Sequence, residues 1–440
     1  MPLVTKFKIL KDWLFQNRGD HQTIAKNTIW LLIGQISSRL LRSAIVIYAA
    51  RILGAESWGA FSYALGIATF LTTFSDIGIN ALITKEASRQ PELKNKYLAT
   101  AFFTKTGILI ILISSVFLFF PYLTKIPEAA AIMPILVFVF AFDSLRDLGS
   151  ALSRALEKMQ IEALINIFTN LAIVILGFIL LFNYQTAYSL ALAYAIGSGI
   201  GLIAIIITLR EHFKNIFTNF QKSMIKTILV TAWPFGLMSL MGVIMLNTDI
   251  IMLGWMRSPA EIGYYSVSQK IIQLLYVLPA LFASSIFPAL SRYVKTDPEK
   301  AKKLLEKSVA LAILIALPIT ALGLILDQPI IQLLFGPEYL PSITSFKILI
   351  ITLLIVYPST LVGNAIFAYD KQRNFIFFVG IAFIGNIAFN WLFIPRFGIE
   401  GAAAATVLTQ LITNGLIWKK MKSVNQFKIW PQIQKILKLK

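Results

Sequence analysis

Residues 27–50, NTIWLLIGQISSRLLRSAIVIYAA, form a mainly apolar run that is long enough to cross a bilayer as a helix. Two arginines, Arg39 and Arg42, lie inside this run. A cation in the hydrocarbon core costs at least about 2.5–3.5 kcal/mol, so such residues persist where they face a protein interior or a water-filled cavity. The stretch therefore predicts a membrane-spanning helix that has one polar, functional face.

The rest of the chain repeats this pattern. Hydrophobic residues make up 57% of the sequence and charged residues only 14%. The apolar runs are continuous and do not alternate with polar residues, which favours helices over a membrane barrel. We therefore predict an all-α integral membrane protein with twelve transmembrane helices, near residues 27–50, 57–84, 97–120, 128–153, 163–182, 186–209, 227–254, 262–291, 308–326, 342–369, 374–395 and 401–418.

The loops predict the orientation of these helices. Lysine and arginine are concentrated in alternate loops, and the other set holds only Arg51, Lys125, Arg257 and Arg396. Basic loops stay on the cytoplasmic side, so both termini should be cytoplasmic in a multi-pass protein of the cell (inner or plasma) membrane. The same bias explains the net charge of +19, and no nucleic-acid-binding motif accompanies it.

The two halves of the chain resemble each other. The segment Asn166–Asn170, NIFTN, has a counterpart in Asn386–Asn390, NIAFN, and Trp58–Ser62, WGAFS, has one in Ile262–Ser266, IGYYS. Six predicted helices separate equivalent points, so the halves should share one orientation as a parallel repeat, an architecture of transporters.

This repeat predicts the domain boundaries. Each half should form a lobe of six helices, with a short cytoplasmic linker joining them. The terminal segments carry lysines beside apolar residues, which is typical of helices that lie on a membrane surface. The predicted parts are an interfacial helix at 1–20, lobes at 21–209 and 225–418, the linker at 210–224, and a basic cytoplasmic tail at 419–440.

Three motifs suggest a family. The segments Ala50–Ser62, ARILGAESWGAFS, Phe74–Gly78, FSDIG, and Asn247–Gly254, NTDIIMLG, resemble the bacterial polysaccharide-biosynthesis flippases. These are the Wzx-type branch of the multidrug/oligosaccharidyl-lipid/polysaccharide (MOP) exporter superfamily, which also contains the multidrug (MATE) exporters. The resemblance implies a V-shaped fold of two lobes. It also implies movement of an undecaprenyl-diphosphate-linked oligosaccharide from the inner to the outer leaflet, for surface polysaccharides such as O-antigen. Membrane lipids, a polysaccharide polymerase and glycosyltransferases are further candidate partners.

The basic residues inside the predicted spans are candidates for binding an anionic cargo. Gln35, Arg39 and Arg42 fall on one face of the first span, and the fork of an arginine binds phosphate oxygens in pairs. The alternative for both arginines is a structural contact with carbonyl groups, Asp76 or Asp143. Weaker candidates for the same cargo are Lys105, Arg146 and Lys270.

Buried acids are candidates for coupling transport to a proton or sodium gradient, and these are Asp76, Asp143 and Asp249. The alternative for the acids is structural ion pairing, as Asp76–Lys105, Asp147–Arg146 and Asp249–Lys270. The asparagines of the repeated motif have two possible uses, hydrogen bonds between helices or contacts with sugars.

No catalytic, metal-binding or cofactor-binding motif is present, so we expect neither enzyme activity nor a bound cofactor. Competing functions are a MATE-like drug or cation exporter, a flippase for the peptidoglycan precursor lipid II, and a glycan polymerase or ligase. The short predicted outer loops argue against the last of these.

Overall fold

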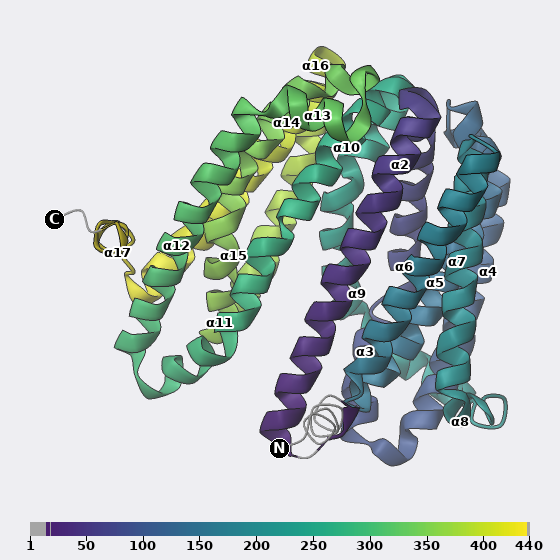
Figure 1. Ribbon diagram of the computed structural model, residues 1–440. Coiled ribbons are helices and arrows are strands. Elements are labelled where there is room, and N and C mark those ends of the chain that lie inside the picture. The colour runs from purple at the N-terminus through teal and green to yellow at the C-terminus, as the bar shows by residue number, and fades with distance from the viewer. Residues whose placement is uncertain (1–14, 18, 438–440) are drawn as a thin grey trace, which may run out of the picture. The chain divides into compact units, whose positions relative to one another are not determined.

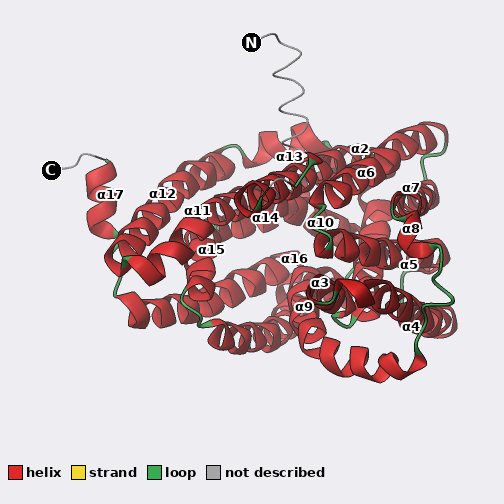
Figure 2. Cartoon of the chain, turned by 90° about the horizontal axis from the view of Figure 1, so that it is seen from below, coloured by secondary structure: helices red, strands yellow, loops and turns green. Residues whose placement is uncertain are grey.

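The computed structural model describes residues 15–17 and 19–437, so the interfacial helix predicted at 1–20 lies almost wholly outside the described residues. The described residues form helices joined by short loops and turns, and they contain no strand (Figures 1 and 2). Its helices are α2 (Asp20–Asp76), α3 (Ile79–Arg89), η1 (Pro91–Leu93), α4 (Lys94–Leu123), α5 (Pro127–Ala155), α6 (Met159–Asn183), α7 (Ala187–Thr208), α8 (Arg210–Phe213), α9 (Lys222–Met256), α10 (Pro259–Leu275), α11 (Val277–Thr296), α12 (Pro298–Ile325), α13 (Asp327–Phe335), η2 (Pro337–Ser342), α14 (Ile343–Ile350), α15 (Thr352–Ala368), α16 (Gln372–Asn425) and α17 (Trp430–Ile436).

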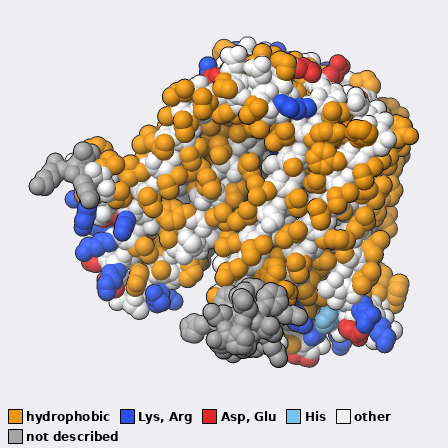
Figure 3. Space-filling view, viewed as in Figure 1, with side chains coloured by type: hydrophobic (Ala, Val, Ile, Leu, Met, Phe, Trp, Pro, Cys, Tyr) orange, Lys and Arg blue, Asp and Glu red, His pale blue; other side chains and the backbone are white. Residues whose placement is uncertain are grey.

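Nine helical stretches of the described residues are long and apolar enough to cross a membrane. The prediction of an all-α integral membrane protein is therefore confirmed. On the face drawn in Figure 3, hydrophobic side chains cover the sides of the helices, while lysine, arginine and acidic side chains gather near the helix ends. This distribution is the one expected when the surrounding solvent is lipid.

Two helices are much longer than one crossing requires. The helix α2 has 57 residues and α16 has 54, whereas a single crossing takes about 20. Each contains one non-helical glycine, Gly54 with φ 72° and Gly398 with φ 58°. Both glycines lie in the short segments predicted between successive spans, so the predicted spans on either side correspond to the two arms of an interrupted helix.

The helices are grouped into two compact units. Unit 1 consists of the chain up to Ile52 together with Ala64–Val243, and unit 2 consists of Leu53–Tyr63 with the chain from Ile244 onward. Within unit 1, α7 packs along both α5 and α6, as Figure 1 shows. Within unit 2, α15 packs against α11, α12 and α16.

One predicted span is broken where the sequence pattern gave no warning. The span at 57–84 is divided into α2 and α3 by Ile77 and Gly78, both with left-handed backbone angles. A Cβ atom on Gly78 would lie 2.2 Å from the Ala232 carbonyl oxygen and 2.4 Å from the Gly236 nitrogen. The break therefore exists where the backbones of two helices of unit 1 approach too closely for a side chain.

Candidate functional site

The side chains of Gln35, Arg39 and Arg42 are all exposed along α2. Within the part of the chain that the structure describes, the Arg39 guanidinium has no ion-pair or hydrogen-bond partner. The alternative of a structural contact with Asp76 or Asp143 is therefore not realised for Arg39. An exposed guanidinium without a counterion can bind an anion without first breaking another contact.

Arg42 is held in place by neutral groups. Its Nε donates a hydrogen bond to Asn170 Oδ1 on α6 at 3.1 Å. Its Cζ lies 5.7 Å from the centre of the Tyr194 ring on α7, within the range of a cation–π contact. The amide nitrogen of Asn170 donates to the Asn166 carbonyl oxygen at 2.7 Å, which fixes the orientation of the amide. Arg42 is thus oriented while its positive charge stays unpaired.

Arg146 on α5 is neutralised by two carboxylates. Its Nη1 lies 2.6 Å from Asp143 Oδ1 and its Nη2 lies 3.2 Å from Asp147 Oδ1. Pairing of these three residues within one helical turn was the predicted structural alternative, and both carboxylates contact the guanidinium. This cluster has a net negative charge, so it is a poorer anion site than α2.

Lys105 on α4 forms the predicted ion pair with Asp76, with a distance of 3.0 Å from Nζ to Oδ1. Its ammonium also donates to Asn80 Oδ1 at 3.1 Å and to the Ser144 carbonyl oxygen at 2.9 Å. The side chain is fully buried. An ammonium has three N–H donors, and all three are used here. No donor of Lys105 is left for a cargo, and Asp76 stays paired with it.

Asp249 on α9 is buried in unit 2 and lies among neutral donors. Its carboxylate accepts hydrogen bonds from Tyr265 Oη at 2.5 Å, Asn390 Nδ2 at 2.8 Å and Thr406 Oγ1 at 2.7 Å. The predicted ion pair with Lys270 is absent from the described residues, because these three donors already surround the carboxylate. Lys270 is half-buried on α10 and has other contacts.

Unpaired oxygens accompany this carboxylate. The amide oxygens of Asn386 and Asn390 are buried on α16 and have no hydrogen-bond partner among the described residues. The Asn390 amide bonds Asp249 through its nitrogen, so its orphan oxygen belongs to the same cluster. A carboxylate beside amide oxygens is a set of ligands that suits a hard cation. Sequence reasoning found Asp249 and both asparagines, but it gave no sign of Tyr265 or Thr406.

The repeated asparagine motif serves the same purpose in both units. Asn170 connects α6 to Arg42 on α2, and Asn390 connects α16 to Asp249 on α9. The prediction of hydrogen bonds between helices is therefore confirmed for both motifs.

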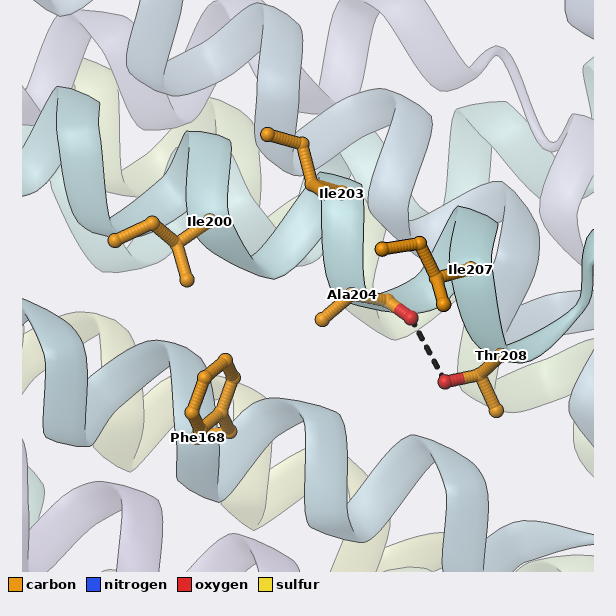
Figure 4. Close-up of a pocket in the computed structure, with 6 residues that line it drawn as sticks. All are labelled: Phe168, Ile200, Ile203, Ala204, Ile207 and Thr208. Atoms are coloured by element: carbon orange, nitrogen blue, oxygen red, sulfur yellow. Dashed lines mark hydrogen bonds between the residues drawn. The ribbon is translucent and has the colours of Figure 1, made fainter.

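An apolar groove of about 400 Å³ lies between α6 and α7. Figure 4 shows Phe168 on one side and five residues of α7 on the other, with the Thr208 hydroxyl donating to the Ala204 carbonyl oxygen at 2.7 Å. No charged side chain lines it, so it is not the predicted anion site.

Comparisons with known proteins give a consistent result. A family model described as polysaccharide biosynthesis protein matches residues 24–294, and a second, described as MatE, matches residues 234–392. The capsular polysaccharide biosynthesis protein CapF of Staphylococcus aureus is 24% identical over 405 residues, which cover 88% of this chain and 97% of CapF. A putative O-antigen transporter of Shigella flexneri is 23% identical over 402 residues, which cover 87% of this chain and 93% of that protein.

A solved structure supports the fold. The lipid II flippase MurJ in an inward closed conformation has a TM-score of 0.72 to this chain at 18% sequence identity. The match covers 91% of this chain and 88% of MurJ. At such low identity the likeness establishes the fold alone.

Proposed function

Because this chain belongs to the polysaccharide biosynthesis protein family, we propose that it is a flippase for a polysaccharide precursor. Its cargo would be an undecaprenyl-diphosphate-linked oligosaccharide, moved from the inner to the outer leaflet for surface polysaccharide assembly. Relatives named as an O-antigen transporter and a capsular polysaccharide biosynthesis protein support this assignment over an enzyme.

The observation that carries the proposal is how the charges within the spans are paired. Lys105, Arg146 and Lys347 each contact a carboxylate, the last through Asp327 at 2.9 Å. Arg39 and Arg42 do not, and both are exposed on the same face of α2. A diphosphate needs uncompensated cations, and arginine binds phosphate with two parallel hydrogen bonds.

In the proposed mechanism the diphosphate is drawn to the face of unit 1 that carries Arg39 and Arg42. The glycan crosses beside these residues while the prenyl chain stays in lipid, and alternating access then exposes the site outward. Twelve crossings with both termini in the cytoplasm fit this scheme: α2 and α16 would each supply two, and α9 would add one. A membrane potential that is negative inside assists an anion moving outward by about 2.3 kcal/mol per charge per 100 mV.

The test is replacement of Arg39 and Arg42 by alanine, singly and together, in a strain that depends on this chain for surface polysaccharide. Loss of a charge-assisted contact worth about 1.5–3 kcal/mol should reduce surface polysaccharide about tenfold or more, without changing the amount of protein in the membrane. Lys125→Ala, which removes an exposed cation elsewhere, is the control and should have no effect. Normal polysaccharide from the double variant would overturn the proposal.

We also propose that Asp249 binds the ion that couples transport to a gradient, either a proton or sodium. Asp76 and Asp143 each contact a cationic side chain, whereas Asp249 contacts only neutral donors. The orphan amide oxygens of Asn386 and Asn390 would complete the coordination of a sodium ion. Protonation would instead neutralise the carboxylate in place, so both ions relieve the same buried charge.

Asp249→Asn keeps the shape of the side chain and removes its charge. In proteoliposomes that contain a lipid-diphosphate sugar, we expect it to abolish stimulation by an imposed sodium or pH gradient while the unstimulated rate remains. Asp147→Asn, which removes a carboxylate paired with Arg146, is the matched control and should stay responsive. If Asp249→Asn still responds to both gradients, coupling does not pass through this residue.

The match to the MatE model favours one competing function, export of a drug or cation. Such an exporter should protect a sensitive host against cationic drugs, and this protection should not depend on Arg39 or Arg42. A flippase with an anionic cargo should give no such protection.

A further inference from the structure

The C-terminal segment is fastened to α12 in unit 2 by one buried glutamate. Glu306 of α12 accepts a hydrogen bond from the Lys428 backbone N–H at 2.7 Å and from Gln432 Nε2 at 3.2 Å. The glutamate is only 6% exposed. Phe427 is buried beside the Trp418 ring, whose centre lies 5.6 Å away. The segment Phe427–Leu437, here called the strap, is therefore docked on the protein and is not a loose tail.

The strap brings lysines next to the lysines of α12. Lys303 and Lys307 are exposed one turn apart on α12, and Lys428 and Lys435 are exposed on the strap. None of these four has an ion pair in the part of the chain that the structure describes. Figure 3 shows Lys and Arg side chains gathered along the lower part of α12. The result is a positive surface built from two elements.

This surface lies where membrane headgroups would lie. A helix of 28 residues such as α12 is about 42 Å long, so its charged first turns extend beyond a hydrocarbon core of about 30 Å. In the strap, Trp430 is 67% exposed and Leu437 is 49% exposed. Exposed tryptophan beside lysine is typical of the interface between lipid and water.

We propose that the strap and the first turns of α12 form a binding surface for anionic phospholipid headgroups. The lysines would attract the headgroups, and Trp430 and Leu437 would enter the outer part of the acyl region. Glu306 acts as a positioning residue, because it holds the strap beside the lysines of α12. Lipid binding at this surface requires only that α12 spans the membrane, and it does not depend on which cargo the protein carries.

The chain contains no cysteine, so a single introduced thiol can report on the strap. Gln434→Cys, at an exposed position of the strap, would carry a spin label in the full-length protein in nanodiscs. We expect less label mobility and greater contact with lipid-dissolved oxygen when phosphatidylglycerol replaces part of the phosphatidylcholine. Raising the salt to 1 M, where the screening length is about 3 Å, should remove most of this difference.

Two sets of variants test the assignment. Lys303→Gln, Lys307→Gln and Lys435→Gln together should abolish the response to anionic lipid. The matched triple Lys214→Gln, Lys222→Gln and Lys226→Gln removes the same charge from unit 1 and should leave the response intact. Glu306→Ala should make the label mobile in both lipids, and Glu306→Gln, which keeps a hydrogen-bond acceptor, should restore part of the order.

Three outcomes would overturn the inference: equal signals in the two lipids for the unmodified strap, a full response in the Lys303/Lys307/Lys435 variant, or reproduction of the response by inorganic phosphate in phosphatidylcholine alone. The first two would show that the lysines do not bind anionic lipid. The third would indicate a site for a single soluble anion. The comparison of the two lipids and the salt titration both use the Gln434→Cys chain with all its lysines. These two measurements remain decisive even if a triple variant folds poorly.

Discussion

Individual charged residues inside the spans follow one physical rule. A buried cation is tolerated when its donors are all occupied, as for Lys105 with Asp76, Asn80 and Ser144. Arg42 departs from this rule: it is exposed, and its partners are an amide and an aromatic ring, which orient the charge without cancelling it. A residue that departs from the rule is a candidate for binding something that the chain itself does not supply.

At this scale we predict that Lys105→Met destabilises unit 1. It leaves the Asp76 carboxylate in a largely buried place without its counterion, a loss worth as much as about 3–5 kcal/mol. The midpoint of thermal unfolding, followed by gel filtration of detergent-solubilised protein, should fall clearly. The double variant Asp76→Asn/Lys105→Met should recover much of the loss. If single and double variants unfold at the same temperature, the ion pair is not what keeps Lys105 buried.

Among the elements, the break between α2 and α3 is the least regular feature of unit 1. It places Asp76 at the end of one helix and Asn80 in the first turn of the next, so that both reach the Lys105 ammonium. The backbone nitrogen of Asn80 also donates to the Asp76 carboxylate at 3.1 Å. The break is therefore fastened by polar side chains as well as by close backbone packing.

Gly78→Ala should damage this element severely. The new Cβ would meet backbone atoms at 2.2–2.4 Å, and the left-handed angle alone costs an alanine about 1–2 kcal/mol. We expect little folded protein in the membrane, measured by fluorescence-detected gel filtration of a tagged chain. Gly107→Ala in α4 has open space around its Cβ and should be neutral or slightly stabilising. Equal yields of the two variants would contradict the account of the break.

For the whole molecule, the orientation in the membrane is the property with the widest consequences, since the proposed direction of transport depends on it. The cysteine-free sequence permits single-cysteine labelling of intact cells with a membrane-impermeant maleimide. Cysteines at Tyr122 and Tyr184, both exposed, should react from outside. Cysteines at Thr218 and Ser423 should react only after the membrane is permeabilised. Labelling of Ser423→Cys in intact cells would show that this residue faces the outside, which would contradict the proposed topology.

How much of this could be predicted depended on which physical signal the sequence contains. The helices could be predicted from the apolar runs, and hydrogen bonds between helices could be predicted from the repeated asparagines. Both predictions were possible because hydrophobicity and residue spacing are local properties of the sequence. The break at Ile77–Gly78 was missed, since it depends on Ala232 and Gly236 far away in the chain. The pairing of charges could be predicted only in part. Asp76 and Lys105 were matched because they lie at a similar depth in their predicted membrane spans. The donors around Asp249 were missed, because they come from helices whose order in space no local pattern reveals.

The duplicated asparagine has a consequence for how such proteins diversify. In one unit it steadies a cation and in the other an anion, so each half of the repeat offers the opposite electrostatic sign. If Arg42 binds the cargo and Asp249 binds the coupling ion, as proposed, substitutions around Arg42 would change which cargo is recognised while the contacts of Asp249 stay untouched, and the reverse would also hold. Under the proposed roles, cargo recognition and ion coupling would be inherited as separate traits. A lineage could then adopt a new glycan cargo without altering its ion-coupling site.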